Sequence, residues 1–184
     1  RPPGADRRKK GAEKTAEGRA RITVRADLPV VGASYSMTYT GDGSGGVVVE
    51  CAYKPGAEKL AMMPRFGMEL VAGPGLERMS WYGRGPAETY SDRAFERVGV
   101  YESTVAREWV EYARPQENGN KTAVRWVELT NAQGLGIRAE GMPLLSVSAR
   151  HAKTSDLEQA AYSFQLPARP EVYLNLDMAQ MGVG

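Results

Sequence analysis

The chain has 184 residues, of which 42% are hydrophobic and 25% charged, and its formal net charge is +2. A chain of this length is expected to form one ordinary domain, or a large one with a tail, and it can bury enough apolar surface to build a core. The composition excludes a disulfide framework, because Cys51 is the single cysteine, and a multi-histidine metal site, because His151 is the single histidine. No apolar run approaches the roughly 18 residues of a membrane span.

The basic charge is concentrated at the start of the chain. Residues 1–25 carry nine basic and three acidic side chains, so the remainder, with 15 basic and 19 acidic residues, has a net charge of −4. Residues 1–18 contain almost nothing to bury, and we predict a poorly ordered leader or cut end there. A basic arm can touch nucleic acid or an anionic surface, but no basic stripe with interleaved aromatic residues follows it, so we expect no nucleic-acid partner. The missing apolar run predicts no membrane partner either.

From residue 19 the hydrophobic pattern has the period of two that is typical of strands. Residues 34–40 alternate strictly, a glycine-rich turn covers 41–46, and 47–53 read as the antiparallel partner in a hairpin. Further short β-rich runs occupy residues 22–26, 66–71, 78–82, 124–129, 144–149 and 172–176. Many short strands separated by Gly, Pro and Asn turns predict an all-β fold, a large antiparallel β-sandwich over residues 19–184.

The helix content is expected to be one or two short helices. The one helix signal covers residues 154–161, where Thr154 or Ser155 is expected to cap the helix and Glu158 to complete a capping box. Two polar stretches, residues 83–93 and 106–122, resist a strand interpretation and are predicted to be long loops. Long ordered loops are where binding sites tend to lie.

Several large apolar side chains are expected in the core or on a sheet face. Cys51 lies in an apolar run, and we predict an inert core residue there. The expected core and sheet-face residues are Tyr35, Met37, Tyr39, Val48, Phe66, Trp81, Trp126, Val147 and Leu174.

The first polar loop combines residue types that suit sugar binding. Two aromatic residues end a strand, glycines follow, and then come charges of both signs, which can contact the C–H face and the hydroxyls of a saccharide. The candidate residues here are Arg84, Glu88, Tyr90, Asp92 and Arg93. The alternative is a surface loop held by arginine–carboxylate pairs over a buried Trp81.

The second polar loop supplies a similar set. Its candidates are Arg114, Gln116, Glu117 and Asn118, which could converge on hydroxyl groups. The alternative is a simple turn in which Glu117 pairs with Arg114. His151 is a further candidate, with a hydrogen-bonded residue at a sheet edge as its alternative.

We predict no catalytic residue in this chain. Retaining glycoside hydrolysis needs two carboxyl groups about 5–5.5 Å apart, one of them with a raised pKa. Glu88, Asp92 and Glu117 each lie within a few residues of an arginine, which favours the ionised form. No Gly-x-Ser-x-Gly motif supports serine catalysis.

The motifs of these loops resemble one family. Over residues 20–184, the chain resembles the C-terminal, small-chain domain of β-galactosidases of glycoside hydrolase family 2. The stretches that carry the resemblance are Met63-Pro64-Arg65-Phe66-Gly67-Met68, residues 81–93, residues 112–120 with Arg125-Trp126, Tyr173-Leu174-Asn175-Leu176-Asp177 and Gln180-Met181-Gly182-Val183-Gly184.

The resemblance implies a galactose mutarotase-like sandwich within a multidomain enzyme that hydrolyses terminal β-D-galactosides with retention. It places the catalytic glutamates and the divalent and monovalent cations in a (β/α)-barrel domain, so no cofactor is expected here. It implies the barrel and other domains of the same polypeptide as partners, with a homo-oligomer left open.

Two features of the family pattern are missing from the sequence. In the family, the residues after the Gln-Met-Gly-Val-Gly motif include a tryptophan that lines the galactose pocket, and a Trp-Arg-Ala-Pro segment opens the domain. Without these features the affinity for free sugar is expected to be weak. Because the catalytic barrel is absent as well, the fragment is expected to be an accessory domain that is inactive alone.

Two other functions stay open from the sequence. One is an independent mutarotase-like enzyme, with His151 and Glu88 or Glu117 as acid and base. The other is a carbohydrate-binding module. A single cysteine fits a cytoplasmic protein and leaves the periplasm open.

Overall fold

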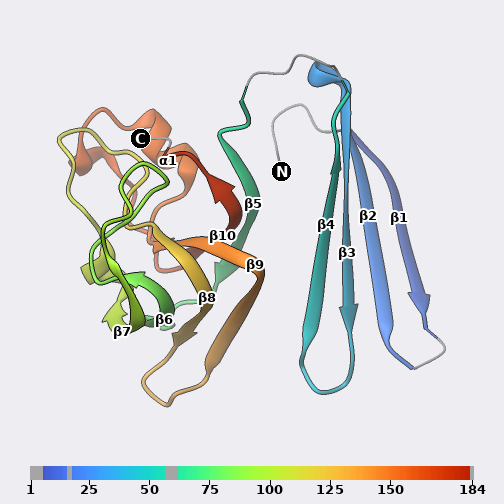
Figure 1. The fold of residues 1–184 in the computed structure, drawn as a ribbon, viewed down its shortest axis with the longest axis horizontal. Coiled ribbons are helices and arrows are strands. Elements are labelled where there is room, and N and C mark those ends of the chain that lie inside the picture. Colours follow the sequence, from blue (N-terminus) through green and yellow to red (C-terminus); the bar gives the residue numbers. More distant parts are fainter. Residues whose placement is uncertain (1–5, 16–17, 57–61, 183–184) are drawn as a thin grey trace. The chain divides into compact units, whose positions relative to one another are not determined.

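A computed structural model describes residues 6–15, 18–56 and 62–182. The chain forms two compact units, Arg1–Met62 and Met63–Gly184, and each contains one antiparallel sheet (Figure 1). Among the described residues α1 (Thr154–Gln159) is the only α-helix, and short 3₁₀ turns make up the other helical segments. The all-β, antiparallel class predicted from the sequence is confirmed.

The first unit is a meander of four strands that pair in chain order. These are β1 (Asp6–Lys14), β2 (Ala20–Leu28), β3 (Ala33–Gly41) and β4 (Val47–Lys54). The turn η1 (Pro29–Val31) joins β2 to β3 and ends at Gly32, whose φ of 62° suits glycine. The predicted hairpin is β3–β4, with Tyr35 opposite Tyr53 and Gly41 opposite Val47.

The predicted leader differs from the structure where the two can be compared. Residues 6–14 form β1 and pair with β2, with Ala12 opposite Ile22, while residues 1–5 and 16–17 lie outside the described part of the chain. Composition could not reveal this strand, because its ladder consists of backbone hydrogen bonds that any residue type can make.

The second unit is a sheet of six strands in the order β5-β10-β9-β8-β6-β7. The strands are β5 (Arg65–Ala72), β6 (Arg78–Gly85), β7 (Arg97–Thr104), β8 (Lys121–Thr130), β9 (Gly136–Arg150) and β10 (Val172–Gln180). The predicted runs 66–71, 78–82, 124–129, 144–149 and 172–176 each lie in one of these strands, and the run 22–26 lies in β2 of the first unit. Strand β7 was not predicted from the sequence; it is an edge strand whose valines Val98 and Val100 are exposed.

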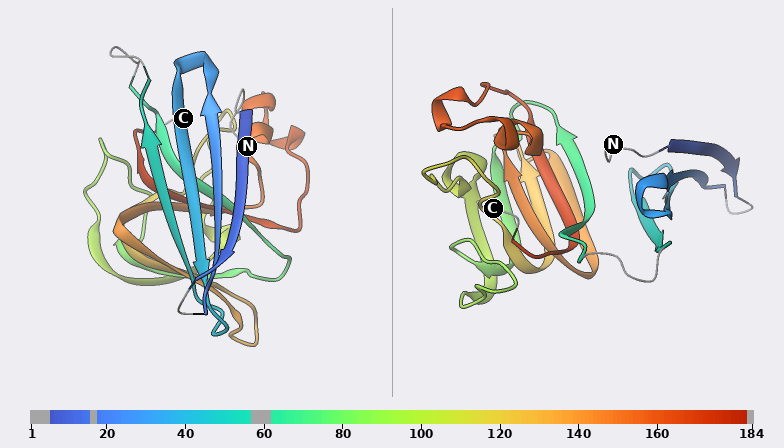
Figure 2. Two further views of the ribbon diagram at one scale, coloured as in Figure 1. Left: turned by 90° about the vertical axis from the view of Figure 1, so that its right-hand side faces the viewer. Right: turned by 90° about the horizontal axis from the view of Figure 1, so that it is seen from above.

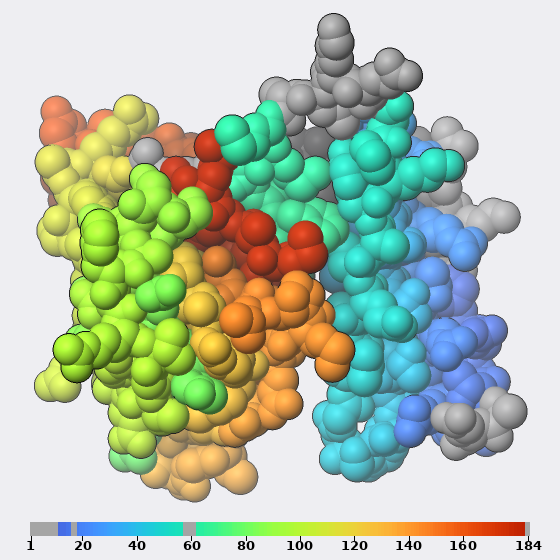
Figure 3. All heavy atoms as spheres, viewed as in Figure 1, coloured from blue at the N-terminus to red at the C-terminus, as the bar shows by residue number. Residues whose placement is uncertain are grey.

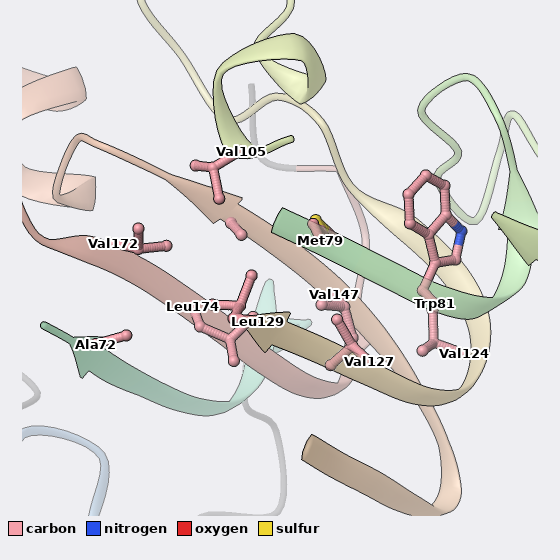
Figure 4. Packing of buried hydrophobic residues seen from close by; sticks show 11 residues of the cluster. Ala72, Met79, Trp81, Val105, Val124, Val127, Leu129, Val147, Val172 and Leu174 are labelled. Atoms are coloured by element: carbon pink, nitrogen blue, oxygen red, sulfur yellow. The ribbon is translucent and has the colours of Figure 1, made fainter. Parts of the chain in front are cut away.

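One apolar cluster holds the second unit together (Figure 4). It joins side chains from β5, β6, β8, β9 and β10 with Val105 of η2 (Val105–Glu108). Trp81 stacks on Tyr101, with ring centroids 5.4 Å apart, and its Nε1 donates to the Arg84 carbonyl at 2.9 Å. The indole is therefore both packed and hydrogen-bonded, as a buried tryptophan requires.

Most of the predicted core residues are buried or half-buried, and two predictions are wrong. Trp81, Val147 and Leu174 are fully buried, whereas Val48 is 62% exposed and Cys51 is exposed as well. Both errors fall on β4, which is one of the two edge strands of its sheet and has one half-buried residue, Tyr53. The remaining expected residues are half-buried: Tyr35, Met37, Tyr39, Phe66 and Trp126.

The predicted capping box of the helix is also wrong. Lys153 occupies the N-cap position, and its backbone N–H donates to the Asp156 carboxylate at 2.9 Å. Arg169 binds the same carboxylate at 2.6 and 2.8 Å, while the Thr154 hydroxyl accepts from Arg150 at 3.2 Å. Several polar residues in succession can start a helix, and the tertiary partner Arg169 favours Asp156.

The elements that surround the candidate site belong to the second unit. In Figure 2, α1 and the segment around residues 105–120 lie on the same side of the six-stranded sheet. The turn η3 (Ser163–Gln165) follows α1 before the chain returns to the sheet as β10.

In the described part of the chain, no helix is both long and apolar enough to cross a bilayer.

Candidate functional site

The two polar stretches singled out in the sequence lie side by side on the surface of the second unit (Figure 3, green to yellow). They are loops except at their ends, where residues 83–85 belong to β6 and residues 121–122 to β8. Thr89 joins them, because its N–H donates to the Asn120 carbonyl at 2.7 Å and its carbonyl accepts from Asn120 Nδ2 at 2.8 Å. The Thr89 hydroxyl also accepts from the Thr122 N–H at 2.9 Å. Most of the residues predicted separately in each loop therefore belong to one region.

Glu88 is the centre of the first cluster. Its carboxylate accepts from the Gly119 N–H at 2.8 Å, the Tyr90 hydroxyl at 3.3 Å, the Tyr112 hydroxyl and the Arg93 guanidinium. Burial alone would raise the pKa of Glu88, but the hydrogen bonds from Tyr112, Gly119 and Arg93 outweigh it and hold the pKa below its ordinary value. Glu88 is therefore an ionised acceptor and is poorly suited to act as an acid.

Gly119 is needed at its position. Its φ is 71°, and a Cβ atom built there would stand 2.5 Å from the Glu108 carbonyl oxygen. A side chain would therefore be strained and would also collide with the backbone of η2. The Asn118–Gly119 turn that the sequence indicated thus brings an N–H group within reach of Glu88.

Glu117 lies in a buried ionic network on the other side of the same loop. Its carboxylate contacts Arg65 Nη1 at 2.9 Å, Arg150 at 2.5 and 3.1 Å, and the Ser148 hydroxyl at 3.0 Å. Arg65 also donates to Asp177 at 2.8 Å from Nε. The positive charges of the two arginines balance the negative charges of the two carboxylates, and this pairing offsets the free-energy cost of burying them.

The two carboxylates of this network titrate differently. Burial would raise the pKa of Glu117, but the charge and hydrogen bonds of Arg150, together with Arg65, outweigh it and lower the pKa. Burial raises the pKa of Asp177, and Arg65 offsets that effect only in part. The sequence alternative that paired Glu117 with Arg114 is wrong, because the partners are Arg65 and Arg150.

The other candidates of the second loop shape its backbone. Asn118 is buried, accepts from the Val110 N–H at 3.2 Å and donates to the Gln116 carbonyl at 3.0 Å. Gln116 donates from Nε2 to the Arg114 carbonyl at 3.4 Å, and Arg114 itself is exposed. These contacts stay within the loop.

Three candidates lie away from Glu88 and Glu117 or serve the backbone. Arg84 donates to the carbonyl oxygens of residues 94 and 96 at 2.9 and 2.8 Å, and Asp92 is exposed. The ring of His151 contacts the Glu171 carbonyl and the Glu77 carboxylate, each at 3.0 Å. No contact in the described structure joins His151 to Glu88 or Glu117, so the mutarotase-like acid–base pair has no geometric support.

Sequence reasoning missed four charged residues of this region. Arg65 and Asp177 were quoted only within longer motifs, and Arg150 was passed over at the end of an apolar run. Lys121 is 1% exposed, donates to the Pro86 carbonyl at 3.0 Å, pairs with Glu108 at 2.5 Å and lies 5.1 Å from the centre of the Trp81 ring. The available signal was a charged residue within a strand or at its end, next to apolar residues.

An open cleft of about 630 Å³ borders this region. Its walls are the turn at Pro86, the segment 93–96 and η2, and Lys121 also lines it. In the ranges that the structure describes, no group of three or more His, Cys, Asp or Glu side chains is placed to hold a metal ion.

Comparisons with known proteins agree with the motifs. Residues 5–184 match the family model described as "Beta galactosidase small chain". The chain is 35% identical to a β-galactosidase of Priestia megaterium over 164 residues, which cover 89% of this chain and 16% of that protein. It is 34% identical to β-galactosidase BgaC of Bifidobacterium adolescentis, covering 81% and 15%, and 36% identical to a β-galactosidase of Lactobacillus delbrueckii subsp. bulgaricus, covering 85% and 16%. The chain thus spans about 15% of the length of these relatives.

Proposed function

Because the chain belongs to the β-galactosidase small-chain family, we propose that it is an accessory, non-catalytic domain of an enzyme that hydrolyses terminal β-D-galactosides with retention. In this proposal the domain contributes one wall of the active-site cleft and packs against the other domains and subunits. The relatives extend well beyond the matched region, which supports further domains in the same polypeptide.

The state of the loop carboxylates is the observation that carries the proposal. Glu88 and Glu117 both have a pKa below the ordinary value and are held by arginines and N–H or O–H donors. Asp177 has a raised pKa, but its side chain is 2% exposed and paired with Arg65. A retaining pair needs an acid that a substrate can reach, so these three carboxylates position loops instead.

The end of the described chain supports a role beside a sugar pocket. The Met181 N–H donates to the Pro64 carbonyl at 3.1 Å, and a Cβ atom at Gly182 would stand 3.5 Å from the Tyr90 ring. In the family that the motifs resemble, the segment that follows this one brings a tryptophan to the galactose pocket. We therefore infer that the Glu88 cluster, through Tyr90, helps to set the direction of that segment.

The remaining parts of the chemistry are assigned to other domains. In this proposal the two catalytic glutamates and the divalent and monovalent cations belong to the barrel domain. The described residues of this chain bind, orient and support, and none of them forms or breaks the glycosidic bond.

A chimera tests the role directly. The matching region of the Priestia megaterium relative would be deleted, or replaced by this chain, and both proteins assayed with a chromogenic β-galactoside. We expect the deletion to abolish turnover and the replacement to restore a measurable part of it. A deletion protein with normal turnover would contradict the accessory role.

The isolated chain provides the second arm. We expect it to show no turnover of the same substrate above the blank. Turnover that survives both Glu88→Gln and Glu117→Gln would show that another catalytic pair exists in this chain, and the proposal would be wrong.

A further inference from the structure

We propose that the cleft between residues 93–96 and η2 binds a neutral saccharide when no other domain is present. This goes beyond the accessory role, which requires no affinity of this chain for sugar. The cleft has a volume of about 630 Å³, within the range of roughly 300–1,000 Å³ that is usual for small-molecule sites.

The walls of the cleft are held in place before any ligand arrives. Arg84 donates to the carbonyl oxygens of residues 94 and 96, which fixes the loop that carries Phe95. Lys121 joins the Pro86 carbonyl to the carboxylate of Glu108 and so ties the turn after β6 to η2. A preformed site saves the free energy that binding would otherwise spend on ordering the loops.

The charges that face the cleft favour a neutral ligand. Glu88 pairs with Arg93, and Glu108 pairs with Lys121. Glu96 and Arg107 line the same cleft, and their side chains make no ion pair within the described part of the chain. One free carboxylate and one free guanidinium give an acceptor and a donor without net charge, which suits hydroxyl groups. A phosphate would be attracted by the guanidinium but repelled by the carboxylate, and a cation the reverse, so neither gains a net attraction from the pair.

An exposed aromatic ring completes the site. The Phe95 side chain lines the cleft and is 90% exposed, which is unusual for a ring of this size. The face of an aromatic ring can cover the C–H groups of a pyranose, and the burial of the ring is itself favourable. The combination of Phe95, Glu96 and Arg107 therefore matches the apolar face and the hydroxyl edge of one sugar unit.

The test is a titration of the ¹⁵N-labelled chain with lactose, followed by NMR. We expect saturable shifts of amide resonances in residues 86–96 and 105–110, with a dissociation constant in the millimolar range. Phe95→Ala and Arg107→Ala should each weaken binding about fivefold. All these side chains are on the surface, and unchanged spectra outside the cleft would show that the variants are folded.

Matched controls come from the same unit. Phe164 is 83% exposed and stacks on Tyr162, and Arg97 is exposed on β7, so Phe164→Ala and Arg97→Ala should leave the affinity unchanged. The proposal is overturned if lactose gives no saturable shift of the amide resonances, or if Phe95→Ala and Arg107→Ala leave the dissociation constant for lactose unchanged. It is also overturned if inorganic phosphate binds the cleft more tightly than lactose. The chimera assay is independent of these results, so the two proposals can fail separately.

Discussion

The two units of the chain build antiparallel sheets from similar alternating patterns, yet their interiors differ. Among the described residues of Arg1–Met62, the buried hydrophobic side chains are those of Ala26 and Ala33. In Met63–Gly184 a cluster that includes Trp81, Leu129 and Leu174 is fully buried. An alternating pattern therefore specifies a strand, while a core also requires large side chains and segments that cover them.

The second unit also buries whole charged residues, whereas no charged residue in the described part of the first unit is fully buried. The Glu117 network lies beside Ser148 of β9 and Asp177 of β10, and these side chains are almost fully enclosed. We therefore expect the second unit to carry most of the stability of the fold, with contributions from both apolar packing and paired charges. The following measurements test that difference, in order of expected effect.

Trp81→Ala should have the largest effect. Removing this buried ring leaves a cavity and takes away the stacking on Tyr101 and the aromatic contact of Lys121. We expect a loss of about 4 kcal/mol in the free energy of unfolding, measured by urea denaturation. Trp109→Ala is the control, because Trp109 is only half-buried and should cost less than half as much. Equal losses would mean that the core is not where the structure places it.

Glu117→Gln should destabilise the protein by about 3 kcal/mol at pH 7, because Arg150 and Arg65 lose a buried counter-charge. The pKa of Glu117 is lower in the folded state than its ordinary value of 4.5. Its ionisation therefore stabilises the fold above about pH 4.5, and this contribution is lost as the pH falls through the lower, folded-state pKa.

The difference in stability between the wild type and Glu117→Gln should accordingly shrink below about pH 4.5. The ionisation of Asp177 has the opposite effect on stability: its pKa is raised in the folded state, so ionisation of this carboxyl group opposes folding. Asp177→Asn should thus cost less than Glu117→Gln at pH 7. The reverse order would contradict the assignment of Glu117 as the ionised centre of the network.

One substitution made in both units compares them directly. Val147→Ala removes two methyl groups from the core of the second unit and should cost about 2 kcal/mol. Val48→Ala makes the same change at an exposed position of β4 and should cost less than about 0.5 kcal/mol. Thermal denaturation of both variants measures the difference, and similar losses would place Val48 in a core.

The smallest effect concerns the reactivity of Cys51. This thiol is exposed on the outer strand of the first sheet, and partial burial raises its pKa above the ordinary value of 9.0. We expect 5,5′-dithiobis-(2-nitrobenzoic acid) to label it in the native state, at a rate that still rises with pH above 9.0. Labelling that requires urea would show that β4 is covered.

Much of the fold was predictable because its signals are local. Alternation over residues 34–40 and the glycines at 41–46 predict the β3–β4 hairpin, since the side-chain period and the turn chemistry act over a few residues. The same holds for the two polar loops, where charged and aromatic residues are adjacent in the chain. The resemblance to β-galactosidases also depends on contiguous motifs.

The sequence by itself determined most of the strands and turns, with β1 and β7 as exceptions, and the residue types of the site. Only the tertiary structure decided the contacts. Glu117 contacts Arg65, which is 52 residues away in the sequence, and Arg150, which is 33 residues away. No local pattern shows which strands are neighbours in a sheet. The order β5-β10-β9 puts Arg65, Asp177 and Ser148 on adjacent strands, where Glu117 can reach them. Burial also depended on tertiary packing: Val48 lies on β4, where nearly every residue is exposed, whereas Val147 lies in the apolar cluster of the second unit, and neither local sequence shows which face of a sheet is covered.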